Sequence, residues 1–138
     1  MAMPDLTELS FIRTFIDKSR LDRYICLISS AKRRSRLARH LAVMRDLNWD
    51  LCHKIPSDRQ TLEQVLGTMR HLGAPCNCRL ISESKELDGK EMPLAEALAA
   101  FFGLGIGTIL ISIPDRLAYC EGEGENARYL CIRQKAHL

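Results

Sequence analysis

Apolar side chains are densest between Pro93 and Pro114. Five of them recur at the spacing of one helix face: Leu94, Ala97, Leu98, Phe101 and Phe102. This spacing predicts a helix over about 93–102, which Pro93 can begin and Gly103 can end. The run Thr108–Ile113 is rich in β-branched residues and ends at a proline. It therefore predicts a strand buried on both faces.

Two other interpretations of this stretch are weaker. Leu94 to Ile113 contains only one charge, Glu96, and about 20 apolar residues can cross a bilayer as a helix. The glycines and the β-branched second half instead indicate a change of secondary structure, so we expect no membrane span. The segment Gly103-Leu-Gly105-Ile-Gly107 has the glycine content of a dinucleotide-binding loop. That loop needs a strand before it and a helix after it, and here the order is reversed.

Periodic apolar positions predict about four helices before residue 73. The first begins near Asp5 or Thr7, and Ser19 is a candidate cap for the second. The third covers much of 32–48, and the pattern leaves open whether it is separate from the second. Ser57 and Gln60 have the spacing of a capping box for the fourth.

The rest of the chain predicts strands. A strand at 76–81, the strand at 108–113, and a hairpin of 117–121 with 127–132 give about four. We therefore expect a single α+β domain over residues 1–138. Its helical half (about 5–72) packs through one shared core on a small, mostly antiparallel sheet in the strand-rich half (about 74–133), with one inserted helix. The two strands that flank this helix would be parallel if they are neighbours.

Composition places the chain among globular proteins, with 46% hydrophobic and 27% charged residues in 138. The N-terminus shows no secretory pattern, so we expect a cytoplasmic protein whose six cysteines are free thiols. The net charge of +3 is unevenly distributed, because positive charge is concentrated before residue 73. Such asymmetry indicates an interaction surface in the first half.

A basic helix face is the main candidate site. It consists of Lys32, Arg33, Arg36, Arg39 and His40. Clustered cations of this kind attract phosphate groups, which makes the face a candidate anion-binding or nucleic-acid-binding site. A solvated face, or one paired with acidic residues of the same chain, is the alternative. Arg34 and Arg45 project nearer the apolar side.

A second candidate surface is acidic. Glu121, Glu123 and Glu125 alternate with glycines at the predicted hairpin tip, where they could contact a basic partner or the basic helix of a second copy. Their alternative role is to keep an exposed hairpin soluble.

Metal binding and catalysis have less support. Cys52, His53, His71, Cys76 and Cys78 could supply zinc ligands, but the single residue between the last two is shorter than the usual ligand gap. Alternate strand positions that face a core would explain both of these thiols. Familiar catalytic motifs are missing from the sequence, and we expect no metal and no cofactor.

The sequence therefore predicts a non-enzymatic cytoplasmic interaction or binding module. Its partner would be another protein or a second copy of itself. A nucleic-acid-binding protein that uses the basic helix face is the first alternative. An enzyme without recognisable motifs is the second. The residues indicate no known family.

Overall fold

A computed structural model describes residues 5–124 and 127–134 and shows an α+β fold. Within these residues there are five α-helices and one six-stranded sheet. The helices are α1 (Leu6–Phe15), α2 (Leu21–Ile28), α3 (Arg34–Ala42), α4 (Leu62–His71) and α5 (Leu94–Phe101). The strands are β1 (Cys52–Lys54), β2 (Asn77–Ser82), β3 (Glu91–Pro93), β4 (Thr108–Ile113), β5 (Leu117–Glu121) and β6 (Arg128–Ile132).

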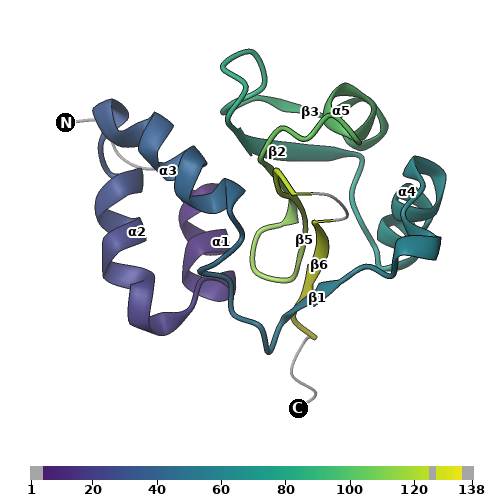
Figure 1. Ribbon diagram of the computed structural model, residues 1–138, viewed down its shortest axis with the longest axis horizontal. Helices are drawn as coiled ribbons and strands as arrows, with labels where there is room; N and C mark the ends of the chain where they lie inside the picture. The colour runs from purple at the N-terminus through teal and green to yellow at the C-terminus, as the bar shows by residue number, and fades with distance from the viewer. Residues whose placement is uncertain (1–4, 125–126, 135–138) are drawn as a thin grey trace.

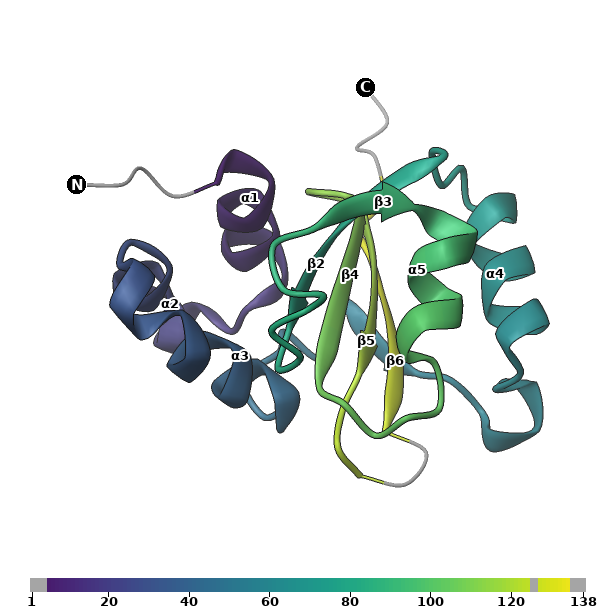
Figure 2. The ribbon, with the colours of Figure 1, turned by 90° about the horizontal axis from the view of Figure 1, so that it is seen from above.

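The sheet is the middle layer of the molecule. Its strand order is β1-β6-β5-β4-β2-β3, and every pair is antiparallel. Helices α1, α2 and α3 lie on one face, and α4 and α5 lie on the other (Figures 1 and 2). Each face has its own apolar cluster. Each cluster combines residues of the helical half and the strand-rich half, so the two halves do share their interior, but the sheet divides it into two cores rather than the single one expected.

The helices before residue 73 do not all lie on the same face of the sheet. Strand β1 follows α3 and carries the chain to the sheet edge, so α4 lies on the opposite face beside α5 (Figure 2). The second and third helices are separate, with a break at Ser29 and Ser30. The second helix begins at Leu21 rather than after Ser19, because the Asp17 side chain caps a short 3₁₀ turn before it.

Two local caps test the sequence patterns. The Asp5 carboxylate accepts a hydrogen bond from the Glu8 amide at 3.0 Å, which confirms Asp5 as one of the two predicted starts of α1. The capping box of α4 is made by Thr61 and Gln64, not by Ser57 and Gln60. Residues 57–59 form a 3₁₀ turn, so the helix starts one turn later than predicted.

The predicted number of strands was too low. Strands β1 and β3 have three residues each and form the two edges of the sheet. The expected parallel arrangement around the inserted helix is also wrong, because β2 and β4 pair antiparallel. The reason is β3, which reverses the chain before α5 begins. The hairpin of β5 and β6 is confirmed.

The central apolar stretch folds as predicted. Residues 94–101 form α5, and residues 108–113 form β4. Residues 108–112 of β4 are buried, and side chains of β4 belong to the clusters on both faces of the sheet. Among the described residues, no helix is long and apolar enough to cross a membrane.

Candidate functional site

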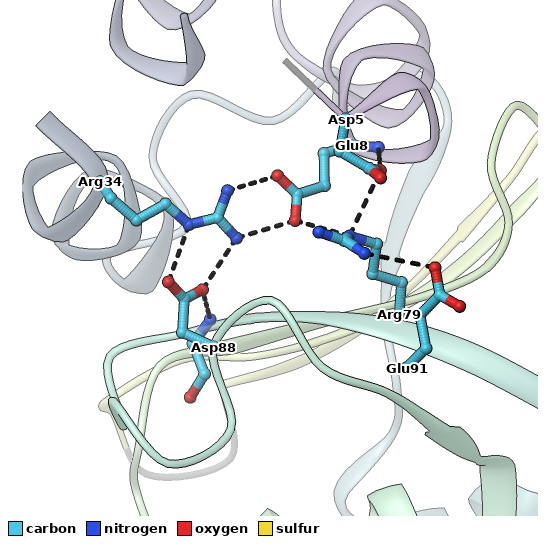
Figure 3. A network of polar contacts seen from close by, with 7 residues as sticks. Asp5, Glu8, Arg34, Arg79, Asp88 and Glu91 are labelled. Carbon is cyan, nitrogen blue, oxygen red and sulfur yellow. Dashed lines mark hydrogen bonds and ion pairs between the residues drawn. The ribbon is translucent and has the colours of Figure 1, made fainter. Parts of the chain in front are cut away.

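A buried ionic network joins the helical layer to the sheet (Figure 3). At its centre is Glu8 of α1, whose side chain is 1% exposed. Its carboxylate accepts hydrogen bonds from both Nη atoms of Arg34 and, at 2.8 Å, from Nε of Arg79. Arg34 also donates to Asp88 at 2.7 and 2.9 Å. The network thus ties α1 and α3 to β2 and the loop after it.

This network removes one cation from the basic segment. Burial alone would lower the pKa of Arg34, but its hydrogen bonds to Glu8 and Asp88 outweigh burial and raise the pKa above its usual value. Arg34 is therefore an internal structural residue, as its predicted position near the apolar side indicated. In the described part of the chain, neither Lys32, Arg33, Arg36 nor Arg39 has a carboxylate within ion-pair distance.

The predicted basic residues lie on the 3₁₀ turn at 31–33 and on α3. Lys32, Arg33, Arg36 and Arg39 are exposed, whereas His40 is half-buried. His40 Nε2 lies 3.2 Å from Nη2 of Arg23. Burial, and next the positive charge of Arg23, lowers the pKa of His40. Asp46, an acid that acts electrostatically on His40, is hydrogen-bonded to Tyr24 at 2.6 Å. We name Arg23, Lys32, Arg33, Arg36 and Arg39 the basic surface.

The predicted acidic surface does not include Glu121. This carboxylate is only 2% exposed. It accepts hydrogen bonds from Tyr119 Oη at 2.9 Å, the Gly103 amide at 2.9 Å and Arg128 Nε at 3.2 Å. The strand pattern placed it at a tip, but β5 extends through residue 121 and turns the side chain inward. Glu123 is exposed, and Glu125 lies outside the described residues.

The cysteines and histidines form no metal site in the described residues, because no three potential ligands gather at one point. Cys52 is buried at one edge strand, and Cys78 is buried on β2. Burial raises the pKa of Cys78 to about 12. Cys76 is exposed, so the expectation that Cys76 and Cys78 both face a core holds only for Cys78.

A groove lies between α4 and the strands β1 and β6. Its volume is about 630 Å³, within the usual range for ligand sites of roughly 300–1,000 Å³. Helix α5 packs on β2, β3 and β4, while α4 packs beside α5. The face of β1 and β6 below α4 is therefore left partly uncovered. Ile55, Val65, Leu130 and Ile132 form the apolar part of its lining.

Cations surround this apolar lining. His53 and Lys54 come from β1, Arg59 from the turn before α4, and His71 from the last turn of α4. Among the residues that the structure describes, the lining contains no carboxylate. We name this hollow, with its apolar lining and its cationic rim, the α4 groove.

A hydrogen-bonded chain fixes one wall of the α4 groove. Gln60 Nε2 donates to the Ile55 carbonyl at 2.6 Å, and Gln60 Oε1 accepts from Arg128 at 2.6 Å. Arg128 is in turn paired with the buried Glu121, and its guanidinium lies 4.8 Å from the centre of the Phe102 ring. Buried charge-assisted bonds of this kind hold a backbone segment in one position. The segment from Ile55 to Gln60 is thus a rigid border of the groove.

Gly67 is the unusual residue of the groove. It lies in the middle of α4, where glycine destabilises a helix by about 1 kcal/mol relative to alanine. Its φ is not positive, and a Cβ atom at this position would meet no heavy atom within 4 Å. Helix packing and backbone conformation therefore do not require glycine here. A side chain would narrow the groove.

Sequence reasoning missed the α4 groove. Its residues come from three segments that only the sheet topology brings together, since β1 pairs with β6 at the far end of the chain. One signal was visible: Gly67 interrupts an otherwise regular helical stripe. An interior helix glycine without a packing partner can mark a surface that must stay open.

Comparison with known proteins gives no functional assignment. No family model, curated protein or solved structure matches the chain.

Proposed function

We propose that this protein is a non-enzymatic binding module whose α4 groove holds a short segment of another protein. The observation that carries the proposal is a groove of about 630 Å³ with an apolar lining, a cationic rim and no lining carboxylate. Apolar surface left open to water favours the burial of complementary apolar side chains. This supports a protein-interaction role for the chain.

The charge of the rim selects the kind of segment. Lys54 and Arg59 are exposed cations, and the exposed imidazoles of His53 and His71 lie on the same rim. A carboxylate beside these residues lowers the energy of the complex, whereas a basic segment is repelled. The proposed occupant is therefore a segment in which apolar residues are flanked by Asp or Glu.

The polar groups of the groove favour binding over chemistry. Its two histidines lie among side chains that include no carboxylate, serine or cysteine. The Thr68 hydroxyl donates to the Gln64 carbonyl at 2.8 Å within the helix. A nucleophile and base in hydrogen-bond reach, the arrangement that covalent catalysis uses, is not formed by these lining residues.

Gly67 supports the same proposal. A residue that destabilises a helix, and that neither packing nor backbone conformation requires, is a candidate for a functional constraint. An open path along α4 is one such constraint, because Gln64, Thr68 and His71 line the groove from the same side of the helix.

A random peptide library displayed on phage tests this function. Selection on the wild-type protein is expected to enrich peptides that combine apolar residues with Asp or Glu. Substitution G67F should abolish the enrichment by filling the groove, while G67A should keep it. Both variants should fold, since the position has open space and both residues are better helix formers than glycine.

The charged rim gives a second arm of the test. Reversing two exposed cations with K54E and R59E should shift the selected peptides from acidic to basic. Three results would contradict the proposal. They are peptide enrichment on the G67F variant, selection of acidic peptides by the charge-reversed protein, and no enrichment on the wild type. Urea unfolding of each variant checks that the fold is retained.

A further inference from the structure

The basic surface on α2 and α3 is distinct from the α4 groove, and the sheet separates the two (Figure 2). We infer that this surface binds the phosphodiester backbone of double-stranded nucleic acid without reading its base sequence. The inference uses residues that the proposed protein-binding function does not involve.

The first argument is that some arginines are paired inside the fold and others are exposed without an ion-pair partner. Arg34, Arg79 and Arg128 are partly buried, and each is paired with a carboxylate inside the fold. The five cations of the basic surface have no such partner within 4.0 Å among the residues described. Two acids near this surface are already used, with Asp88 bonded to Arg34 and Asp46 to Tyr24, whereas Glu83 interacts electrostatically with Arg39. The positive potential of this surface is therefore only partly compensated, by Glu83 near Arg39.

The second argument is that the surface is continuous and held in place. Arg33 Nη1 donates to Cys26 Sγ at 2.7 Å, and Arg23 lies 3.2 Å from His40. The first contact joins the 3₁₀ turn at 31–33 to α2, and the second joins α2 to α3; Arg36 of α3 is exposed. On the buried side of α3, Leu37 and Leu41 pack in the core, and the Arg34 network ties α3 to the loop after β2.

The third argument is a polar recess at the far edge. A hollow of about 400 Å³ lies between α3 and the loop after β2, and Lys32, Ser35, Arg39 and Lys85 line it. The lining also includes Arg34 and two carboxylates: that of Asp88, which is bonded to Arg34, and that of Glu83, which accepts from the Gly107 amide at 3.2 Å. Burial, and next the neighbouring Glu123, raises the pKa of Glu83. Three of its four cations, Lys32, Arg39 and Lys85, have no described carboxylate within ion-pair distance, which suits a phosphate group.

The residue types favour phosphodiester over other anions. Four of the five cations are arginines, whose planar guanidinium matches phosphate oxygens in a bidentate manner. Lys32 to Arg39 spans roughly 10 Å along the helix, enough to reach several phosphates of a duplex. No aromatic residue belongs to this set, so it offers no stacking platform for unpaired bases. Contacts to the backbone alone do not distinguish one sequence from another.

Fluorescence anisotropy with a labelled random-sequence DNA duplex of about 20 base pairs tests the inference. Four phosphate contacts predict a slope of log K against log [KCl] of about −3 to −4. That slope corresponds to roughly 100-fold weaker binding at 200 than at 50 mM KCl. The triple variant R33A/R36A/R39A should bind about 10-fold or more weakly, with the slope reduced by about 3.

A matched control removes the same net charge elsewhere. The triple variant K54A/R59A/R70A loses three exposed cations on or near α4 and should bind the duplex like the wild type. The single variant R36A, whose side chain has no described partner, should reduce the slope by about 1 and serves if the triple variant fails to fold.

Four outcomes would overturn the inference. They are wild-type binding that is absent at 50 mM KCl, binding that is insensitive to salt, equal loss in both triple variants, and competition by polyglutamate or phosphatidylserine vesicles as effective as unlabelled duplex. The last result would identify the surface as a site for an acidic protein or a membrane instead.

Discussion

At the residue scale, Glu8 is the side chain on which the join between helices and sheet depends most. It is buried, and it receives hydrogen bonds from both Arg34 and Arg79. Removal of one partner from a buried ion pair leaves charge that is neither solvated nor neutralised. Substitution E8Q is therefore expected to lower the free energy of unfolding by about 3 kcal/mol. This is the lower end of the range for broken buried pairs, because Arg34 keeps its hydrogen bond to Asp88.

Glu91 is the matched control for Glu8. It also bonds to Arg79, at 3.2 Å, but its side chain is 69% exposed. An exposed pair of this kind contributes less than about 1 kcal/mol. Urea unfolding monitored by circular dichroism should separate E8Q from E91Q clearly. Equal decreases in the free energy of unfolding of the two variants would mean that the buried network does not stabilise the packing of the helices on the sheet.

The Arg34 network also shows how far residue patterns reach. Helical periodicity placed Arg34 nearer the apolar side than Arg33 and Arg36, and the structure agrees. The pattern could not supply its partners, because Glu8 and Asp88 are 26 and 54 residues away in the chain. Composition treats all of these arginines alike, although one is internal and the others face water.

At the element scale, long and strongly periodic segments were predictable and short ones were not. Helix α5 and strand β4 have continuous apolar patterns that define their type. Strand β1 is Cys-His-Lys and strand β3 is Glu-Met-Pro, and neither has a strand signature. Both exist because a neighbouring strand offers hydrogen bonds, which is a tertiary effect. The α4 groove was missed for the same reason.

The start of α4 gives a test at this scale. Thr61 Oγ1 accepts from the Gln64 amide at 3.1 Å, and the Gln64 side chain accepts from the Thr61 amide at 3.2 Å. Loss of such a cap costs about 1 kcal/mol. We expect T61A to lower the free energy of unfolding by that amount and S57A to have little effect, since the 3₁₀ turn at 57–59 has no side-chain cap. A larger loss in S57A, measured by thermal unfolding, would favour the earlier helix start.

At the scale of the whole molecule, the two proposed surfaces lie on opposite sides of the sheet. The basic surface belongs to the layer of α1, α2 and α3, and the α4 groove belongs to the layer of α4 and α5 (Figures 1 and 2). The groove exists because α5 covers the central strands while α4 packs beside α5. Substitutions in one surface should therefore leave the other surface intact.

The uneven charge of the chain has a structural origin at this scale. The basic excess of the first half is not uniformly displayed, because Arg34 is used inside the fold. Part of the acidic excess of the second half is internal as well, since Glu121 is buried against Arg128. The sequence predicted the asymmetry, whereas only the fold shows which charges reach the surface.

The occupant of the α4 groove is tested most directly by a ¹⁵N–¹H correlation NMR titration. The probe is a synthetic peptide of about eight residues, a length that an extended groove site can hold, with alternating leucine and glutamate. The account predicts shifts concentrated in residues 53–56, 64–71 and 130–132, and none from a leucine and lysine peptide at the same concentration. Shifts concentrated on the basic surface instead, or equal shifts from both peptides, would contradict it.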